Sequence, residues 1–206
     1  ILAAGRAVLS PASAGLRLGV VLQHGFRDGA VALRDLLASG RLGSVQAASM
    51  AVPWWRPQSY YDEPGRGSLA RDGGGVLLTQ AIHTLDLFRA LLGVRRVVAA
   101  QARTTGLHRM QTEDHVQALV ELGEGAPASI LATTAAYPGR AESIEVIGML
   151  GTARFEGNSL HAAFLDGTRL DVVSDARTGA GAGMMDFDHG PHRALLADFL
   201  DAVATG

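Results

Sequence analysis

The chain contains no cysteine and no lysine, and both absences narrow its chemistry. Without cysteine it forms no disulfide and offers no thiolate to a metal, which fits a reducing, cytoplasmic environment. Arginine supplies all 18 basic residues against 20 acidic ones, and the net charge of -2 argues against nucleic-acid binding. No run of about 18 apolar residues occurs, so no membrane segment is expected. The 206 residues, 48% of them hydrophobic, are enough to form a hydrophobic core without disulfides or bound metals.

The strongest pattern is a glycine turn, residues 73–75, that leads into an apolar stretch carrying one histidine. Residues 76–92 have apolar side chains around more than half of a helical circumference, which predicts a single, largely buried helix. Three glycines let the backbone reach positive φ and approach a ligand closely, and Asp72 is expected to accept from the amides that open the helix.

Thr79 and His83 are four residues apart, so both would lie on one face of that helix, with Asp86 three residues further on. His83 has two interpretations. It can hydrogen-bond to a carboxylate such as Asp86 as an ordinary buried histidine, or it can act as a general acid/base, because its unperturbed pKa is about 6.5. The pattern alone favours neither.

The loop ahead of the glycine turn is rich in aromatic residues and arginine: Trp54, Trp55, Arg56, Tyr60, Tyr61 and Arg66. Aromatic faces pack against the C–H faces of sugars, and guanidinium groups hold hydroxyl or carboxylate oxygens. This composition suits one wall of a site for a polyhydroxylated ligand. The alternative is a rigid surface loop pinned by large side chains.

Short apolar runs separated by glycine turns predict a sheet over most of the chain. The expected strands are residues 45–52, 97–105, 115–122, 128–136, 143–147, 153–156, 159–165 and 169–173. An amphipathic helix is expected at 28–39, with Gly40 as its stop. Many strands and few helices indicate the α+β class, an open, mainly antiparallel sheet with helices packed on one face. The other face favours sheet-to-sheet packing with another subunit.

Seven histidines raise the question of a metal, most clearly in the segment with Asp186, Asp188, His189 and His192. His192 is expected to begin a helix rather than share a face with His189, because Pro191 suits the first helical turn. No other ligand set is recognisable. A loop in which Asp188 caps the helix is therefore preferred, and no metal site is predicted.

Together these segments resemble the C-terminal domain of the glucose-fructose oxidoreductase, inositol dehydrogenase and MocA (Gfo/Idh/MocA) family of NAD(P)-dependent oxidoreductases. The resemblance covers residues 20–27, 33–43, 60–67, 72–93, 112–114, 144–148, 151–153 and 192–206, and the glycine-helix-histidine segment is its most specific part. It implies a dihydrodipicolinate reductase-like C-terminal fold for residues 25–206, which would bind substrate and form a homodimer or homotetramer through the open sheet face. Residues 1–24 would be a remnant of an N-terminal Rossmann domain, with a helix at 1–9, a turn at 10–15 and a strand at 18–23.

The resemblance also implies a reaction, the oxidation of a hydroxyl on a sugar, cyclitol or related polyol with hydride transfer to NAD or NADP. His83 would be the general acid/base, and Thr79 stands where many members have an aspartate or asparagine that orients the hydroxyl. The implied substrate-binding residues are Tyr60, Tyr61, Arg66 and His192, and the implied residues near the cofactor are Gln23 and His24. The family's glycine-rich phosphate turn and its Glu-Lys-Pro lysine are not found, so the chain is not expected to bind the cofactor by itself.

A second hypothesis is a noncatalytic module for sheet-mediated dimerisation or ligand sensing. Thr79 favours it, as does Gly25, where family members often carry arginine. Retention of His83 favours the enzyme. The two hypotheses differ in whether His83 is accessible or is walled off and bonded only to Asp86.

Overall fold

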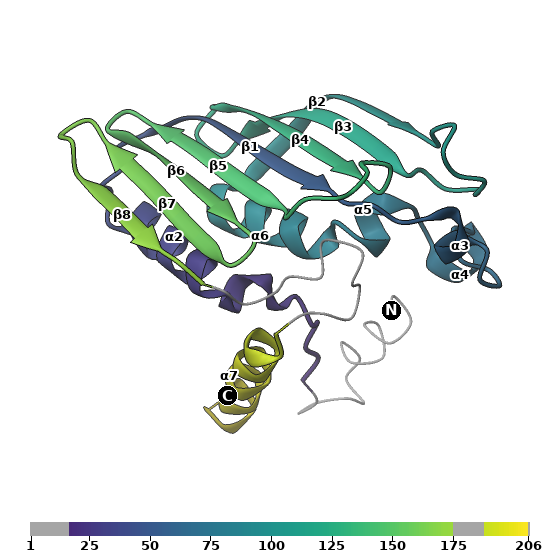
Figure 1. Ribbon diagram of the computed structural model, residues 1–206. Coiled ribbons are helices and arrows are strands. Elements are labelled where there is room, and N and C mark those ends of the chain that lie inside the picture. The colour runs from purple at the N-terminus through teal and green to yellow at the C-terminus, as the bar shows by residue number, and fades with distance from the viewer. Residues whose placement is uncertain (1–16, 175–187, 206) are drawn as a thin grey trace.

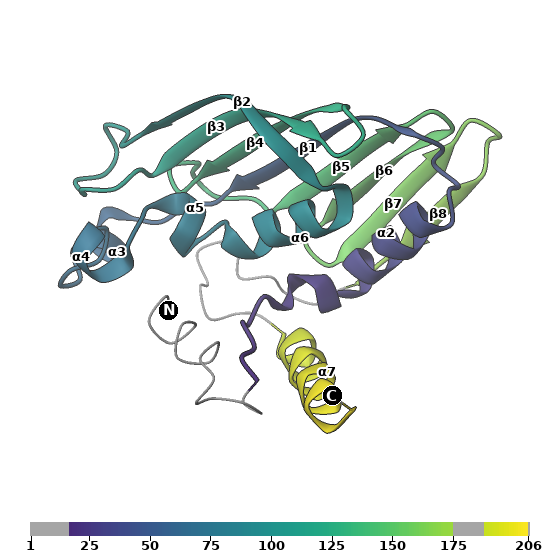
Figure 2. The ribbon, with the colours of Figure 1, turned by 180° about the vertical axis from the view of Figure 1, so that it is seen from behind.

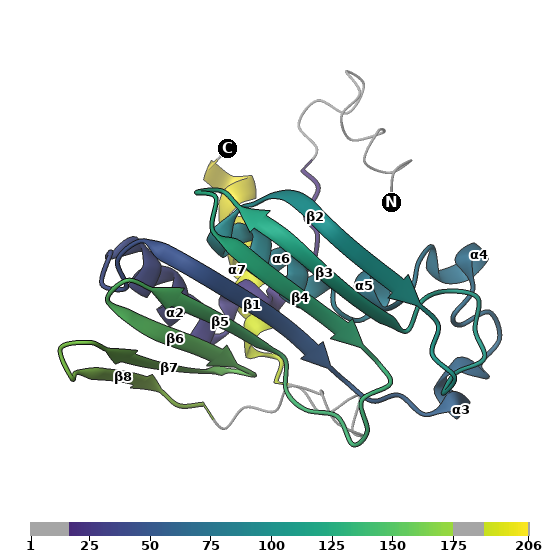
Figure 3. The same cartoon turned by 90° about the horizontal axis from the view of Figure 1, so that it is seen from above.

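The computed structural model describes residues 17–174 and 188–205, which form an open sheet with helices against one face (Figure 1). Views from behind and from above show the same layering, with the helices of the described residues gathered on one side of the sheet (Figures 2 and 3). The α+β class predicted from the sequence is confirmed. The side of the helix layer that faces away from the sheet carries the segment Gln23–Phe26 and the C-terminal helix.

The sheet has eight strands in the order β2-β3-β4-β1-β5-β6-β7-β8. Their bounds are β1 Val45–Pro53, β2 Val94–Arg103, β3 His115–Leu122, β4 Pro127–Thr133, β5 Ser143–Gly148, β6 Gly151–Glu156, β7 Ser159–Phe164 and β8 Arg169–Val172. Strand β1 pairs in parallel with β4, and every other neighbouring pair is antiparallel. All eight predicted strands are present, with ends that differ by a few residues from the prediction.

The helices are η2 Gln23–Phe26, α2 Asp28–Ala38, α3 Gln58–Tyr61, α4 Leu69–Asp72, α5 Val76–Thr79, α6 Ile82–Leu92 and α7 Gly190–Thr205. Helix α2 follows its predicted pattern, because Ala30, Leu33 and Leu36 are buried and the helix ends two residues before Gly40. At the start of α7, Asp188 Oδ1 accepts from Gly190 N at 3.1 Å, as predicted for its cap. In the described ranges, no helix is long and apolar enough to cross a lipid bilayer.

The core lies between the sheet and the helices α2 and α6. Alternate residues of the central strands point into it, and Met50 of β1 lies beside Ile130 of β4 and Ile144 of β5. Phe88 of α6 and Leu33 of α2 are fully buried against this surface. Each such side chain contributes about 1.5–3 kcal/mol by leaving water, so this layer holds the α6 segment rigidly over the sheet.

The strand predicted at residues 18–23 is wrong. Residues 18–22 have no regular structure, and Gln23 begins the 3₁₀ helix η2. A strand needs a neighbour for its backbone N–H and C=O groups, and none of the eight strands pairs with this apolar run. The helix predicted at 1–9 and the turn at 10–15 lie outside the described residues.

The single helix predicted for residues 76–92 is also wrong, because two helices occupy it. The chain leaves helical geometry at Gln80, with φ -127° and ψ -52°. The carbonyl oxygen of Val76 accepts from both Gln80 N at 3.1 Å and Ala81 N at 2.9 Å. Gln80 turns its side chain to the loop before the helix, where Nε2 donates to Tyr60 Oη at 2.9 Å. Apolar periodicity does not detect such a break, because the apolar residues on either side of it still recur at helical intervals.

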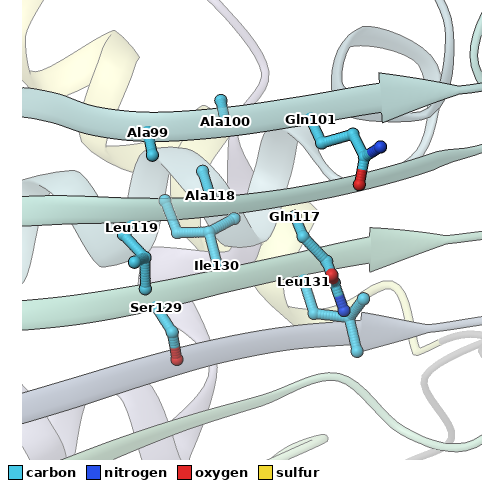
Figure 4. A pocket seen from close by; sticks show the side chains of 9 residues that line it. All are labelled: Ala99, Ala100, Gln101, Gln117, Ala118, Leu119, Ser129, Ile130 and Leu131. Atoms are coloured by element: carbon cyan, nitrogen blue, oxygen red, sulfur yellow. The ribbon is translucent and has the colours of Figure 1, made fainter.

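The face of the sheet opposite the helices is shallow and mixed in chemistry (Figure 4). A depression of about 530 Å³ lies over β2, β3 and β4. Two cross-strand rows line it, Ala99 beside Leu119 and Ser129, and Gln101 beside Gln117 and Leu131. Further along the sheet the same face becomes charged, with Arg154 beside Glu145 and His161 beside Asp171.

Candidate functional site

The glycine turn before α5 positions the site through Glu113 rather than through Asp72. Gly75 N donates to Glu113 Oε1 at 3.1 Å, and Val76 N donates to the Glu113 carbonyl oxygen at 2.8 Å. A Cβ on Gly75 would lie 2.1 Å from that carbonyl oxygen, so only glycine fits there. Asp72 ends α4, and its Oδ2 accepts from Gly67 N at 2.6 Å. The prediction that Asp72 accepts from the opening amides of the α5 helix is therefore wrong.

His83 lies in the first turn of α6 and faces η2. Its ring centre is 5.2 Å from that of His24, and its Nδ1 is buried with no hydrogen-bond partner among the described residues. The predicted alternative, a hydrogen bond from His83 to Asp86, is not seen, and Asp86 instead pairs with Arg89 at 3.9 Å. Burial, then Arg27 and His192, lower the pKa of His83 below its usual value. The half-buried ring is therefore neutral near pH 7, the form that can accept a proton.

His24 belongs to a closed polar network beneath His83. It is 3% exposed, Arg27 Nη2 donates to its Nε2 at 2.6 Å, and its Nδ1 lies 3.3 Å from Thr84 Oγ1. Since arginine only donates, Nε2 must accept, and neutral His24 carries its proton on Nδ1. Burial, followed by Arg27, lowers the pKa of His24 well below its usual value. Both ring nitrogens are thus committed within the domain.

The network ends in a buried ion pair. Arg27 Nη1 donates to Glu142 Oε1 and, at 3.0 Å, to the Gly157 carbonyl oxygen. Trp54 Nε1 donates to the second oxygen of Glu142 at 3.2 Å. Arg27 is 6% exposed and Glu142 is fully buried. The two opposite charges pair with each other, and the hydrogen bonds from Trp54 and to Gly157 add to the pair.

His192 and Gln23 flank this group. His192, in the first turn of α7, is close enough to His24 and His83 to lower the pKa of both, after burial and Arg27. Gln23 Oε1 is buried without a hydrogen-bond partner among the described residues. The structure thus brings together His83, His24 and His192, which come from three separate segments of the chain.

Four other predicted residues, Tyr60, Tyr61, Arg66 and Thr79, line a cavity of about 300 Å³. Its other lining residues include Met110 and Thr112 from the loop before β3. His83 and His192 are not among the lining residues. Because the helix breaks at Gln80, Thr79 does not share a continuous face with His83. The hydroxyl of Thr79 donates to the Gly75 carbonyl oxygen at 2.9 Å, and the side chain remains at the cavity wall.

The two tyrosines are held in different ways. Tyr61 Oη lies 2.6 Å from Thr134 Oγ1, and burial raises the pKa of Tyr61 to about 12, so its hydroxyl stays protonated. The Tyr60 ring packs edge-on against it at 5.0 Å. The guanidinium carbon of Arg66 lies 4.0 Å from the centre of the Tyr60 ring, and Arg66 pairs with Glu63 at 2.7 Å.

The loop before β3 holds the backbone of the aromatic loop in place through His108. His108 is buried, with Nδ1 2.6 Å from Asp114 Oδ2 and Nε2 2.8 Å from the Arg56 carbonyl oxygen. Asp114 also accepts from Thr105 N and Oγ1, each at 2.7 Å. These bonds fix the backbone of the aromatic loop where it leaves β1, and they orient the tyrosines from outside the cavity.

Sequence reasoning missed Arg27, Glu142, His108 and Gln80 as supports of the site. Arg27 and Glu142 are 115 residues apart and Gln80 is 20 residues from Tyr60, so no local spacing reveals these pairs. His108 is only six residues from Asp114, but no helical or strand periodicity links the two. A usable signal existed only for Arg56, which stood in the predicted aromatic wall but received no role of its own. In the described part of the chain, no group of three or more His, Cys, Asp or Glu side chains could hold a metal ion.

Comparison with known proteins gives a consistent result. A family profile described as the GFO/IDH/MocA C-terminal domain matches residues 30–154, more than half of the chain. A comparison with curated proteins gave no match.

Solved structures resemble the chain closely in fold. The WlbA dehydrogenase from Bordetella pertussis, in complex with NADH and UDP-GlcNAcA, is 34% identical with a TM-score of 0.68, over 75% of this chain and 48% of that one. The WlbA enzyme from Chromobacterium violaceum, with the same ligands, is 27% identical with a TM-score of 0.66, over 89% and 53%. A levoglucosan dehydrogenase in complex with NADH and levoglucosan is 20% identical with a TM-score of 0.74, over 92% and 57%.

The chain therefore spans about half the length of these structures. The matched profile, the α+β sheet with helices on one face and the glycine-helix-histidine segment agree with one another. The chain belongs to the GFO/IDH/MocA family and contains its C-terminal domain.

Proposed function

We propose that this domain binds and positions the substrate of an NAD(P)-dependent dehydrogenase that oxidises a hydroxyl of a sugar, cyclitol or related polyol. The observation that carries the proposal is the state of His83. Its ring is neutral near pH 7, and its Nδ1 has no partner among the described residues. A histidine kept only for packing would have its nitrogens satisfied, as those of His24 are.

In this proposal His83 is the general acid/base. It takes the hydroxyl proton as the C–H bond on the same carbon is broken and the carbonyl forms, and it returns a proton in the reverse direction. Burial and then the positive charge of Arg27 disfavour a charged imidazole and lower the pKa of His83, so the base form persists below the ordinary histidine pKa. When bound, the nicotinamide cofactor supplies the hydride acceptor.

Tyr60, Tyr61, Arg66 and His192 are proposed to contact the substrate, and Thr79 to line its site. The cavity of about 300 Å³ beside the tyrosines is at the small end of ligand pockets, and it would hold one part of the substrate, because His83 and His192 do not line it. Its walls offer the apolar faces and hydroxyls that a sugar requires. The 34% identical WlbA structure, which holds NADH and a nucleotide sugar acid, supports this substrate class.

Gln23 and His24, near the start of the described residues, are the proposed contacts to the cofactor. The unpartnered amide oxygen of Gln23 can accept a hydrogen bond from the cofactor, and Gln23 is the residue we propose for this contact. His24 suits the role less, because Arg27 and Thr84 occupy both ring nitrogens. The proposed role of His24 is to pack against the ring of His83 and hold it in position. The choice between NAD and NADP is not encoded in these residues.

A homodimer or homotetramer is proposed to form through the open sheet face. Leu119 is 56% exposed in the depression over β2, β3 and β4, whose other lining side chains are small, aliphatic or amide (Figure 4). Such a surface can pack against its own copy, since neither sign of charge dominates it. Leu119→Glu should convert the assembly to monomers in multi-angle light scattering, whereas Leu165→Glu, an exposed substitution at the end of β7, should not.

The test of the dehydrogenase is nicotinamide reduction by the full-length protein across a panel of aldoses, inositols and their acids. His83→Ala should lower turnover by about a hundredfold or more. His189→Ala, whose side chain is 92% exposed, is the matched control and should keep full turnover. Equal loss in both variants would contradict a role for His83.

A second candidate is a noncatalytic, ligand-sensing or dimerisation module. The observation that favours it is Thr79, whose hydroxyl is already engaged by the Gly75 carbonyl oxygen. Intact cofactor binding with no turnover on any member of the panel would favour this module.

A further inference from the structure

The structure leaves the residues of the proposed site in two groups. Four of them line the cavity of about 300 Å³: Tyr60, Tyr61, Arg66 and Thr79. His83 is not among its lining residues and faces η2 instead. A substrate that meets both groups requires a fixed distance between them, because a misplacement of about 1 Å can lower a rate about a hundredfold. Gln80, which lies between the two groups in the chain, makes the contacts that can set this distance.

The backbone between α5 and α6 makes a π-type turn. Ala81 N donates to the Val76 carbonyl oxygen, five residues earlier, at 2.9 Å, whereas an α-helix joins residues four apart. The extra residue is Gln80, whose φ of -127° and ψ of -52° differ from helical values. One-residue insertions of this kind are frequent at functional sites. Helix α6 begins two residues later, at Ile82, so this turn sets the direction of its first turn.

The side chain of Gln80 ties this turn to the wall of the cavity. Gln80 is 8% exposed, and its Nε2 donates to Tyr60 Oη at 2.9 Å. Tyr60 is itself held on two sides, because its ring packs edge-on against Tyr61 at 5.0 Å and the guanidinium carbon of Arg66 lies 4.0 Å from its centre. The acceptor of the Gln80 hydrogen bond is therefore a fixed point on the cavity wall.

His83 lies between two anchored residues. Three residues before it, Gln80 is bonded to Tyr60, and directly after it, the buried Thr84 has its Oγ1 3.3 Å from His24 Nδ1. One anchor faces the cavity and the other faces η2. The start of α6 has no side-chain cap of its own. The two anchors together therefore fix the turn that carries the His83 ring, and the anchor at Gln80 is the one that refers to the cavity.

We propose that Gln80 is a positioning residue, which holds His83 at a fixed place relative to the cavity through its hydrogen bond to Tyr60. Gln80 does not line the cavity, so it acts through Tyr60 on one side and through the backbone of α6 on the other. This inference rests on the proposed function, in which His83 is the acid/base and the cavity holds part of the substrate. It adds the residue that joins these two parts of the site.

Loss of this hydrogen bond should lower kcat rather than raise KM in the full-length protein. Gln80→Met has a similar length but cannot donate to Tyr60, and it should lower kcat about tenfold because His83 is misplaced. KM should stay within about twofold, since the cavity lining is unchanged. Gln46→Met, which removes an exposed donor to the Ser44 carbonyl oxygen, is the matched control and should keep both constants. A higher KM with an unchanged kcat would overturn the proposal.

Tyr60→Phe removes the same hydrogen bond from its other end, and it takes the place of Gln80→Met if that variant does not fold. It should also lower kcat about tenfold. Because both substitutions break one bond, the double variant should lose no more kcat than about the larger of the two single losses. Losses that multiply in the double variant would show that Gln80 and Tyr60 act separately, and they would refute the assignment.

A measurement without turnover separates this inference from the proposed function. The ring centres of His83 and His24 are 5.2 Å apart, so the NMR signals of both rings respond to a displacement of α6. In protein with isotope-labelled histidine, Gln80→Met should shift both signals more than Gln46→Met does, and His83→Ala identifies the His83 signal. Such shifts without any turnover would support the positioning role and reject the dehydrogenase. Turnover that depends on His83, with kcat and ring signals unchanged in Gln80→Met, would do the reverse.

Discussion

Two buried arginines in this domain have opposite surroundings. Arg27, at the start of α2, meets Glu142, a carbonyl oxygen and His24, and each partner is itself hydrogen-bonded. Arg56, after β1, meets aromatic rings and one carbonyl oxygen of its own loop. Burial alone therefore does not tell what an arginine is for. The two arginines differ in their partners, because Arg27 has an ion pair as well as hydrogen bonds, whereas Arg56 has no ion pair among the described residues.

The largest expected effect comes from breaking the satisfied pair. Glu142→Leu should lower the free energy of unfolding by about 3–5 kcal/mol, since Arg27 would then be buried without its counter-charge. Urea denaturation followed by far-UV circular dichroism measures the loss. The double variant Arg27→Met with Glu142→Leu should recover much of it, and a double variant as unstable as the single one would contradict the explanation.

The pH dependence of stability should reveal the histidines beside Arg27. Burial lowers the pKa of His24 and His83 in the folded state, whereas both titrate near 6.5 in the unfolded chain. Below pH 6.5 the unfolded chain binds more protons, so stability falls as the pH drops, until the folded-state pKa values are reached. The limiting slope is about 1.4 kcal/mol per pH unit for each proton, and the slope that these histidines add fades between about pH 7 and pH 8.

Denaturation midpoints between pH 5 and pH 8 measure that slope. His24→Phe should make the decline below pH 6.5 shallower, because one of the two groups is removed. His189→Gln is the control, since its side chain is exposed. A slope that is the same in His24→Phe and the wild type would show that His24 titrates freely.

A smaller loss of stability is expected for Tyr61, which lines the cavity. Tyr61→Phe removes the hydroxyl that lies 2.6 Å from Thr134 Oγ1, and it should cost about 1–2 kcal/mol because Thr134 is fully buried. Tyr137→Phe, at a residue that is 78% exposed, should change the midpoint of denaturation very little. The same loss for both tyrosines would mean that the Tyr61 hydroxyl is not held by Thr134.

The smallest effect is expected for Arg56→Leu. Removing an unpaired buried charge relieves its desolvation while losing some packing, so the free energy of unfolding should change by less than about 1 kcal/mol. Urea denaturation without added ligand is the measurement. A loss as large as that of Glu142→Leu would place Arg56 with Arg27 as a structural charge, and the contrast between the two arginines would disappear.

The strands were largely predictable because alternation is local. In β3, Val116, Val120 and Leu122 are buried on one face, and the prediction of residues 115–122 matches the observed strand. Helix α2 was predictable for the same reason. The break at Gln80 was not, because a side-chain bond to Tyr60, twenty residues earlier, accompanies it. The strand at 18–23 failed because pairing, rather than composition, makes a strand.

The sequence by itself determined the sheet, the α2 helix and the residue types of the site, because periodicity, turn residues and composition act over short distances. It also carried the resemblance that the family profile confirms. Only the tertiary structure decided which polar groups are satisfied. The pairing of Arg27 with Glu142, the bond of His108 to the Arg56 carbonyl oxygen, and the absence of an ion pair for Arg56 among the described residues depend on where separate segments meet in space. Hydrogen bonds and ion pairs act over a few ångströms, and the fold sets that distance.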